Sequence, residues 1–168
     1  SVTALFFGGI SLAVEPCADF FLEVLRANAA KRLVMLDPNI RPQFIMDETR
    51  YRDRLEQILE FTDVLKISDE DLDWIDPTES KLDHKVSNIL MNGPELVCLT
   101  LGATGVKVFS KYGLIAEAVP TPVEVVDTVG QLLDAYVELR HEDESFLGTV
   151  RRLGIEPFKD RVYADANN

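Results

Sequence analysis

Short apolar runs alternate with amphipathic stretches along most of the chain. The runs are bounded by glycine, proline or charged residues and carry few polar side chains, which is typical of strands buried on both faces. They lie at residues 4–7, 33–36, 64–67 and 96–100. The pattern therefore predicts four buried strands.

The stretches between these runs have apolar residues at helical spacing. The predicted helices span residues 16–30, 51–61 and 85–91. A further helix is expected to begin after the third strand, where Ser68 would act as the N-cap and the acids up to Asp71 would occupy the first turn.

Two more apolar segments, at residues 105–109 and 114–116, flank Tyr112-Gly113 and predict a β-hairpin. Strands that alternate with helices indicate a mostly parallel sheet with helices on both faces, an α/β layered fold. We expect this arrangement over residues 4–118. In such folds ligands collect at the carboxyl ends of the strands, so the polar residues that follow each strand are the candidates for a functional site.

A carboxylate, an amide and a guanidinium follow the second strand, at Asp37, Asn39 and Arg41. Arginine offers a planar fork of donors that suits phosphate or carboxylate groups. Lys66, in the next strand, would also reach a phosphate, although strand lysines usually face water. A proline-containing turn with solvated polar groups is the plainer interpretation, and the sequence alone favours it.

Two other strand ends carry candidate ligand-binding residues. Thr100 is followed by Gly102 and Gly105, which permit positive φ and would let backbone amides cradle a phosphate. So short a motif also fits a plain turn into the next strand. The acids between Ser68 and Asp71 would arrange Mg²⁺ through water, or would only complement the helix dipole.

The acidic composition narrows the class of ligand. The formal net charge of −12 argues against nucleic-acid binding, which depends on clustered Lys and Arg, and against an anionic membrane surface. The acidic charge stays compatible with ATP binding, because local amides and a few cations hold the phosphates of ATP.

Cys17 and Cys98 lie far apart among apolar neighbours, which predicts small core residues and favours a reducing cytoplasm.

Five segments stand in a characteristic order along the chain. They are Phe6-Phe7-Gly8-Gly9-Ile10-Ser11-Leu12, Leu36-Asp37-Pro38-Asn39-Ile40-Arg41-Pro42, Leu65-Lys66-Ile67-Ser68-Asp69-Glu70-Asp71-Leu72, Thr100-Leu101-Gly102-Ala103-Thr104-Gly105 and Val126-Asp127-Thr128-Val129-Gly130. This order resembles the PfkB/ribokinase-type carbohydrate kinases, most of all their fructokinase and 2-keto-3-deoxygluconate kinase branch. The resemblance implies a three-layer α/β/α ribokinase-like fold. It also implies transfer of the γ-phosphoryl group of Mg-ATP to a sugar or sugar acid, and it leaves a homodimer open.

The resemblance implies roles for the residues after the second and third strands. Asn39 and Arg41 would lie near the phosphates of ATP, and Arg41 also near the sugar acid. Ser68 and Asp71 match the ends of the family's N-x-x-E motif, which tunes the binding of Mg²⁺ and phosphate. Both residues depart from the usual letters of that motif, and Asp71 would act on the metal only indirectly.

Further implied roles fall on the fourth strand and beyond. Thr100, Gly102 and Gly105 would border the adenosine and the phosphates. Asp127 matches the acid that opens the family's D-T-x-G-A-G-D motif and helps to hold the substrate in some members. Gly130 matches the first glycine of that motif, at the start of the anion hole that opens a helix.

The match to this motif ends at Gly130. The family continues with Ala-Gly-Asp, whereas the chain reads Gln131-Leu132-Leu133. Leu133 stands where the family has its catalytic base, and leucine cannot accept a proton. Asp134 lies one position later, which on a helix turns it about 100° away. The N-terminal portion that supplies the lid and most sugar contacts is also absent, so we expect no catalytic base and an impaired kinase.

The sequence after Gly130 no longer matches the kinase motifs. We therefore expect an ATP-binding half at residues 1–130 and a short helical tail of different origin at residues 131–168. The tail resembles the C-terminus of bacterial sulfite/nitrite reductase haemoproteins, but it contains no cysteine that would ligate haem or an iron–sulfur cluster. An apolar stripe is predicted in the tail, formed by Leu132, Leu133, Tyr136, Leu139 and Phe146.

Three functional hypotheses follow: a sugar kinase, a non-catalytic nucleotide-binding or structural remnant, and a reductase accessory segment. The missing base separates the first from the second, and the lack of metal ligands counts against the third. The sequence leaves open which sugar is bound, whether the chain folds or turns over alone, and what its oligomeric state is. It also leaves open whether the chain is a natural fusion, a misassembled frame or an engineered product.

Overall fold

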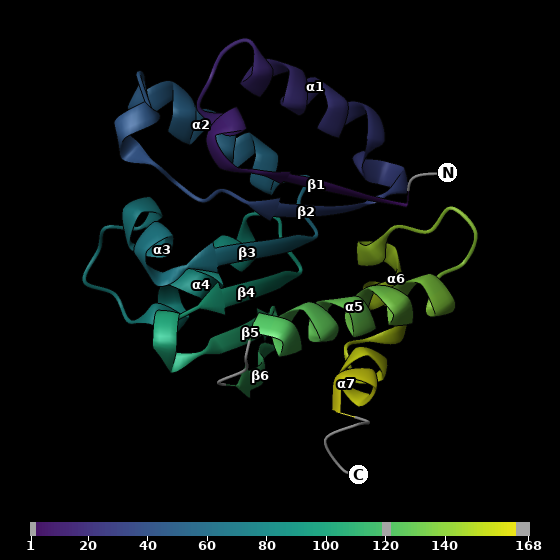
Figure 1. The fold of residues 1–168 in the computed structure, drawn as a ribbon. Helices are drawn as coiled ribbons and strands as arrows, with labels where there is room; N and C mark the ends of the chain where they lie inside the picture. The colour runs from purple at the N-terminus through teal and green to yellow at the C-terminus, as the bar shows by residue number, and fades with distance from the viewer. Residues whose placement is uncertain (1–2, 119–121, 164–168) are drawn as a thin grey trace.

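The sheet at the centre of the molecule follows the order of the sequence (Figure 1). The computed structural model describes residues 3–118 and 122–163. Strands β1 to β4 are parallel, and β5 and β6 are antiparallel to their neighbours. The strands are β1 (Ala4–Gly8), β2 (Leu33–Asp37), β3 (Val64–Ser68), β4 (Leu96–Thr100), β5 (Val106–Ser110) and β6 (Gly113–Ala118). The four predicted buried strands and the hairpin at Tyr112-Gly113 are confirmed.

Helices connect and cover the strands. The α-helices are α1 (Cys17–Asn28), α2 (Glu48–Leu59), α3 (Asp69–Ile75), α4 (Leu82–Met91), α5 (Pro122–Leu139), α6 (Phe146–Leu153) and α7 (Glu156–Tyr163). Short 3-10 helices are η1 (Gly9–Leu12), η2 (Ala29–Lys31), η3 (Pro42–Phe44) and η4 (Gly102–Thr104). Each α-helix predicted from spacing is present, but α2 and α4 begin three residues earlier than expected. For α2 the reason is Asp47, whose carboxylate accepts a hydrogen bond from the Arg50 amide and so caps the helix.

Alternate residues of the strands pack into different layers. On β4, Val97 and Leu99 belong to the apolar cluster that includes residues of α1 to α4, whereas Leu96 and Cys98 belong to the cluster that includes residues of α5 to α7. This alternation is the period of two that a strand imposes on its side chains. The three-layer α/β/α architecture expected from the sequence is confirmed.

The distribution of helices between the two faces differs from the expectation for residues 4–118. Buried residues of α1, α2, α3 and α4 share one apolar cluster, and the opposite face is covered by α5 to α7. The physical reason is the strand order. Right-handed crossovers that advance across a sheet in one direction place every connecting helix on the same face.

The last three helices form the second outer layer. Tyr136, Phe146 and Phe158 are almost completely buried, and their rings meet edge to face at centroid distances of 5.4 and 5.5 Å. Leu132 and Leu133 are half-buried in the same cluster. Leu139 is 36% exposed, so the predicted apolar stripe is correct except for this residue. Helix α5 continues without a break through residues 130 and 131.

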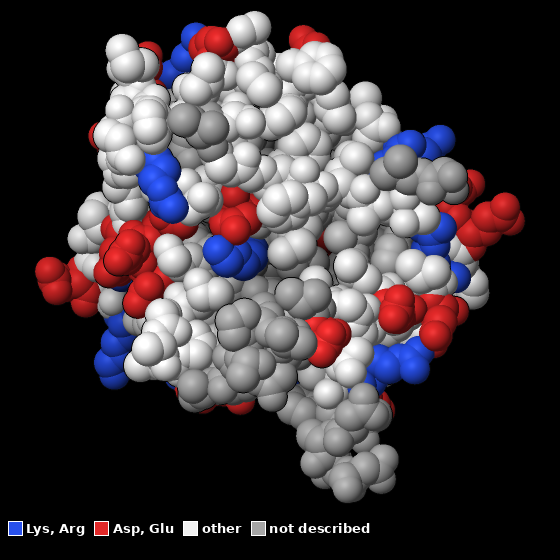
Figure 2. All heavy atoms as spheres, viewed as in Figure 1, with Lys and Arg blue, Asp and Glu red and all other residues white. Residues whose placement is uncertain are grey.

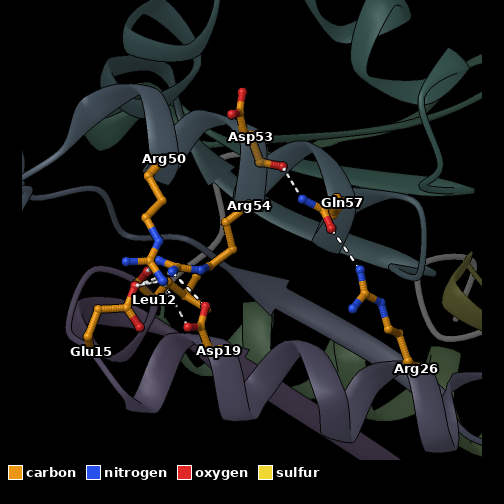
Figure 3. Close-up of polar contacts among 8 residues, drawn as sticks. All are labelled: Leu12, Glu15, Asp19, Arg26, Arg50, Asp53, Arg54 and Gln57. Atoms are coloured by element: carbon orange, nitrogen blue, oxygen red, sulfur yellow. Dashed lines mark hydrogen bonds and ion pairs between the residues drawn. The ribbon is translucent and has the colours of Figure 1, made fainter.

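On the side of the sheet opposite to α5–α7, a group of polar contacts joins α1 to α2 (Figure 3). We call this group, formed by Arg54 with Leu12, Glu15 and Asp19, the polar clasp. Arg54 of α2 is only 5% exposed. Its guanidinium donates to the Leu12 carbonyl at 3.2 Å and to Asp19 Oδ1 at 2.9 Å, and it also pairs with Glu15. The hydrogen bond from Arg54 lowers the pKa of the Asp19 carboxyl below its ordinary value. The clasp fixes the segment that leaves β1 at its carboxyl end.

Candidate functional site at the carboxyl edge of the sheet

The strand register gathers the predicted site residues at one edge of the sheet. Gly8 is opposite Asp37, and Ser68 is opposite Thr100. The segments that follow these residues therefore leave the sheet side by side, as expected for parallel strands. The close approach of β1 and β2 needs a glycine at position 8, because a Cβ there would lie 2.6 Å from the Asp37 carbonyl oxygen.

An ion pair lies between the ends of β2 and β3. Lys66 Nζ is 2.9 Å from Asp37 Oδ2, and both side chains are partly exposed. In the part of the chain that the structure describes, Asp37 Oδ1 is buried and has no hydrogen-bond partner. Figure 2 shows acidic and basic side chains in contact near the middle of the face, over β2 and β3. Lys66, which a strand pattern alone would place in water, thus belongs to the candidate site.

Asp71 ties the segment after β2 to the start of α3. Its carboxylate Oδ1 accepts a hydrogen bond from the Ile40 amide at 3.1 Å, and its own amide donates to Ser68 Oγ at 3.1 Å. The predicted N-cap role of Ser68 is therefore confirmed. Burial raises the pKa of the Asp71 carboxyl above its ordinary value, and the charge of Asp37 raises it further. These contacts hold Asn39 and Arg41 close to the end of β3.

Two substitutions of Asp71 distinguish the contribution of its hydrogen bond to stability from the contribution of its charge. Asp71→Ala leaves the Ile40 amide without a partner and is expected to lower the free energy of unfolding by roughly 1–3 kcal/mol. Asp71→Asn keeps an acceptor oxygen and removes the buried charge, so we expect little loss at neutral pH. Urea denaturation followed by circular dichroism measures both.

The pH dependence provides the control for this interpretation. A carboxyl whose pKa is raised on folding favours the folded state below its unfolded pKa, and this contribution is lost as the pH rises through the folded pKa. The unfolding free energy of Asp71→Asn should therefore decline less with rising pH than that of the unchanged chain. Equal pH profiles for the two proteins would contradict the assignment.

Asn39 and Arg41 are both exposed at this edge. Asn39 has a φ of 41°, in the left-handed region that asparagine tolerates better than most residues. The Arg41 guanidinium donates to the Ile40 carbonyl at 2.8 Å and keeps further donors for a ligand. The two side chains are thus presented to solvent by a segment whose backbone is fixed.

The turn after β4 has the geometry that its glycines predict. Gly102 and Gly105 have φ values of 55° and 111°. The amide of Leu101 donates to the Gly105 carbonyl at 2.8 Å, and the amide of Thr104 to the Leu101 carbonyl at 3.0 Å. Thr100 Oγ1 lies 3.4 Å from the Ile67 carbonyl, which links this turn to the end of β3.

The residues expected from the D-T-x-G segment lie on a helix. Because α5 begins at Pro122, Gly130 lies inside this helix and not at its first turn. Asp127 is exposed. Leu133 packs with the apolar cluster of α5 to α7. Among the contacts of the described residues, none joins Asp127 or Gly130 to Arg41.

The charges at the carboxyl edge suit a phosphate better than a directly bound metal. Arg41 and Lys66 supply cations, and the turn at Gly102 supplies backbone at positive φ. The described residues contain no cluster of three or more His, Cys, Asp or Glu side chains that could hold a metal ion. A Mg²⁺ ion here would need the phosphates of a nucleotide as ligands, with Asp71 reaching it through water.

No helix among the described residues is both long enough and apolar enough to cross a bilayer. Cys98 is buried, which raises the pKa of its thiol to about 11, and Cys17 is half-buried; neither forms a disulfide. The prediction that Cys98 is a small core residue is confirmed.

Comparison with known proteins points to one family. The pfkB family of carbohydrate kinases matches residues 1–130. A fructokinase from Rhizobium leguminosarum bv. trifolii is 41% identical over 128 residues, which are 76% of this chain and 38% of that protein. A probable fructokinase-4 from Arabidopsis thaliana is 30% identical over 163 residues, which are 91% of this chain and 50% of that protein.

Solved structures show the same fold. A fructokinase with bound ATP from Xylella fastidiosa gives a TM-score of 0.68 at 20% identity and covers 94% of this chain and 51% of its own. A fructokinase from Vibrio cholerae O395 with fructose, ADP and calcium ion bound gives 0.67 at 20% identity, with 96% and 52% covered. The chain thus spans about half or less of these proteins. The match to the probable fructokinase-4 covers 91% of this chain and so extends past residue 130, and it gives no support to the reductase resemblance of the tail.

Proposed function

Because the chain belongs to the pfkB family of carbohydrate kinases, we propose that its carboxyl edge is the phosphate-binding part of an ATP site. The observation that carries the proposal is the convergence of Arg41, Lys66 and the turn at Gly102–Thr104 on one edge of the sheet. In a complete protein of this kind, the site would support transfer of the γ-phosphoryl group from ATP to a sugar or sugar acid, with fructose as the first substrate to test.

The proposed positions of the ligand follow from the donors at the edge. The phosphates lie between Arg41, Asn39 and Lys66, since these side chains offer charge and hydrogen bonds to anionic oxygens. The adenosine lies toward Thr100 and Gly105. In this arrangement the Lys66 ammonium pairs with a phosphate, either in place of Asp37 or together with it. Mg²⁺ accompanies the phosphates, with Asp71 in its outer coordination shell.

Calorimetry of ATP binding tests this placement. Arg41→Ala is expected to weaken binding by roughly 1–3 kcal/mol, the range for a hydrogen bond to a charged group. Lys66→Ala is expected to act in the same direction. The measurement is made on the full chain in the presence of Mg²⁺.

Arg26→Ala serves as the matched control. Arg26 is an exposed arginine on α1 that donates to Gln57 on α2 (Figure 3), so its loss removes the same charge at a distance from the proposed phosphates. Unchanged ATP affinity in Arg41→Ala and Lys66→Ala would remove the carboxyl edge from the binding site.

A second candidate function is a nucleotide-binding or structural module without turnover. The observation that favours it is Leu133, which packs in the cluster of α5 to α7 at the position expected for the base.

We further propose residues 131–168 as a tail of different origin, Asp127 as a substrate contact and Gly130 as a phosphate neighbour. Free cysteines support a cytoplasmic location.

A further inference from the structure

Helix α3 joins the candidate site to the contacts made by α2. Its first turn contains Asp71, which accepts the hydrogen bond from the Ile40 amide. The helix spans only Asp69–Ile75, so it is about 10 Å long. In so short a helix, a tilt or shift of the last turn also moves the first turn. The contacts that fix the far end of α3 therefore influence where Asp71 lies.

An arginine of α2 holds this far end. The guanidinium of Arg52 donates to the Trp74 carbonyl at 2.9 Å and to the Ile75 carbonyl at 3.3 Å. Both carbonyls belong to the last turn of α3, where the helix itself offers few donors. The last turn contains no basic residue of its own. Arg52 thus supplies the positive charge that the carboxyl-terminal end of a helix dipole favours.

The side chain of Arg52 is fixed by further contacts. Its Nε donates to Glu48 Oε1 at 2.8 Å, one turn earlier on α2. Its Cζ lies 3.9 Å from the centroid of the Trp74 ring, which is the arrangement of a cation–π contact. Arg52 therefore binds the backbone and the aromatic ring of α3 at the same time, which an ion pair with Glu48 alone would not require.

Tyr51 extends the support from the last turn of α3 toward its first. Its ring is 4% exposed and meets the Trp74 ring edge to face at 5.7 Å. Burial and, after it, the charge of Asp71 raise the pKa of the Tyr51 hydroxyl to about 12. Tyr51 is thus close to Asp71 as well as to Trp74. Two consecutive residues of α2 accordingly support α3 over its whole length.

We propose that Arg52 is a positioning residue for the phosphate site. It fixes the last turn of α3, and this short helix places Asp71. The Asp71 carboxylate in turn holds the amide of Ile40, which stands between Asn39 and Arg41 in the chain. Arg52 touches no phosphate itself and acts only through these contacts. This role rests on the proposed function, because the residues that Arg52 positions are those that would hold the phosphates of ATP.

Hydrogen exchange on the full chain without ligand tests the structural part of the proposal. Arg52→Ala is expected to speed exchange of the Ile40 amide at least about tenfold, because local opening costs less once α3 is released. The amide of Val97, which is 0% exposed in β4, reports global stability and serves as the internal reference. If the ratio of the Ile40 and Val97 exchange rates were the same in both proteins, the proposal would be wrong.

Calorimetry with ATP and Mg²⁺ tests the functional part. Arg52→Ala is expected to raise the dissociation constant of ATP about 2- to 30-fold, the range for residues that act on a site through others. A residue that only stabilised the fold would leave this constant unchanged in a folded protein. Arg50→Ala is the matched control and should leave the constant unchanged, because Arg50 is on the same helix but pairs with Asp19 of α1 at 2.9 Å.

The calorimetry separates failure of this proposal from failure of the proposed function. Unchanged affinity in Arg52→Ala together with weaker binding in Arg41→Ala would overturn the role of Arg52 and leave the ATP site in place. Unchanged affinity in Arg41→Ala and Lys66→Ala, or no ATP binding by the unchanged chain, would refute the ATP site and the role of Arg52 with it.

A double-mutant cycle identifies the route by which Arg52 acts. In Asp71→Ala the connection from α3 to Ile40 is already broken. Adding Arg52→Ala to this variant should therefore change the dissociation constant of ATP by less than about twofold, the level at which separate effects cannot be distinguished. If the effects of the two substitutions multiplied in full, Arg52 would act by another route, and the proposal would be contradicted.

Discussion

Sugar-dependent release of ADP by this chain is expected to be slower than that of an intact fructokinase by at least about 10²–10⁴-fold, the usual contribution of a general base. Leucine at position 133 cannot take the proton of the attacking hydroxyl. The sequence given matches 38% of the Rhizobium fructokinase, so the comparison is made with that protein at equal molar concentration. A coupled assay with fructose and 2-keto-3-deoxygluconate makes the measurement.

The matched variant restores Ala-Gly-Asp in place of Gln131-Leu132-Leu133. Its stability must be measured in parallel, because Leu132 and Leu133 pack in the cluster of α5 to α7 and glycine inside a helix costs about 1 kcal/mol relative to alanine. Activity only after restoration would support the assignment of the base position. Rapid sugar-dependent turnover by the unchanged chain would refute the expectation.

Phe158→Ala is expected to lower the free energy of unfolding by about 3–5 kcal/mol, the range for truncating a buried phenylalanine. Phe158 has 0% exposure and meets Phe146 edge to face. Because small domains have only about 5–15 kcal/mol of stability, this single change should shift the urea midpoint strongly. The experiment asks whether the tail is an integral layer of the fold.

Val137→Ala is the control in the same layer. Val137 is 53% exposed on α5, and a surface change of this kind usually alters stability by less than about 0.5 kcal/mol. If Phe158→Ala were as mild as Val137→Ala, the packing of α7 against the sheet would contribute little. The tail would then be dispensable for folding.

The sequence predicted β2, β3 and β4 well because these strands are largely buried on both faces and read as apolar runs. Ser68 was also predictable, since an N-cap depends on residues close in sequence. The layer assignment was less accurate. Whether a helix covers one face or the other depends on the order of strands in space, which the apolar pattern does not encode.

The candidate site was predictable as a set of strand ends but not as a set of contacts. The Lys66–Asp37 ion pair and the Asp71–Ile40 hydrogen bond each join residues that are about thirty positions apart. Both depend on the register of neighbouring strands, which the sequence does not state. The motif at residues 126–130 carries no signal for the start of a helix, whereas α5 begins at Pro122 and runs through this segment.

The strictly sequential strand order has a consequence for synthesis on the ribosome. Each strand from β2 to β6 can add to the strand made just before it, so the sheet can grow in the direction of translation through contacts that are local along the chain. The face that α5 to α7 later cover remains exposed during this growth. Leu33 and Val64 on this face pack in one cluster with Phe146 and Phe158, which are synthesised last. A nascent chain whose six strands are paired therefore still exposes the apolar side chains of this face until α6 and α7 have left the exit tunnel.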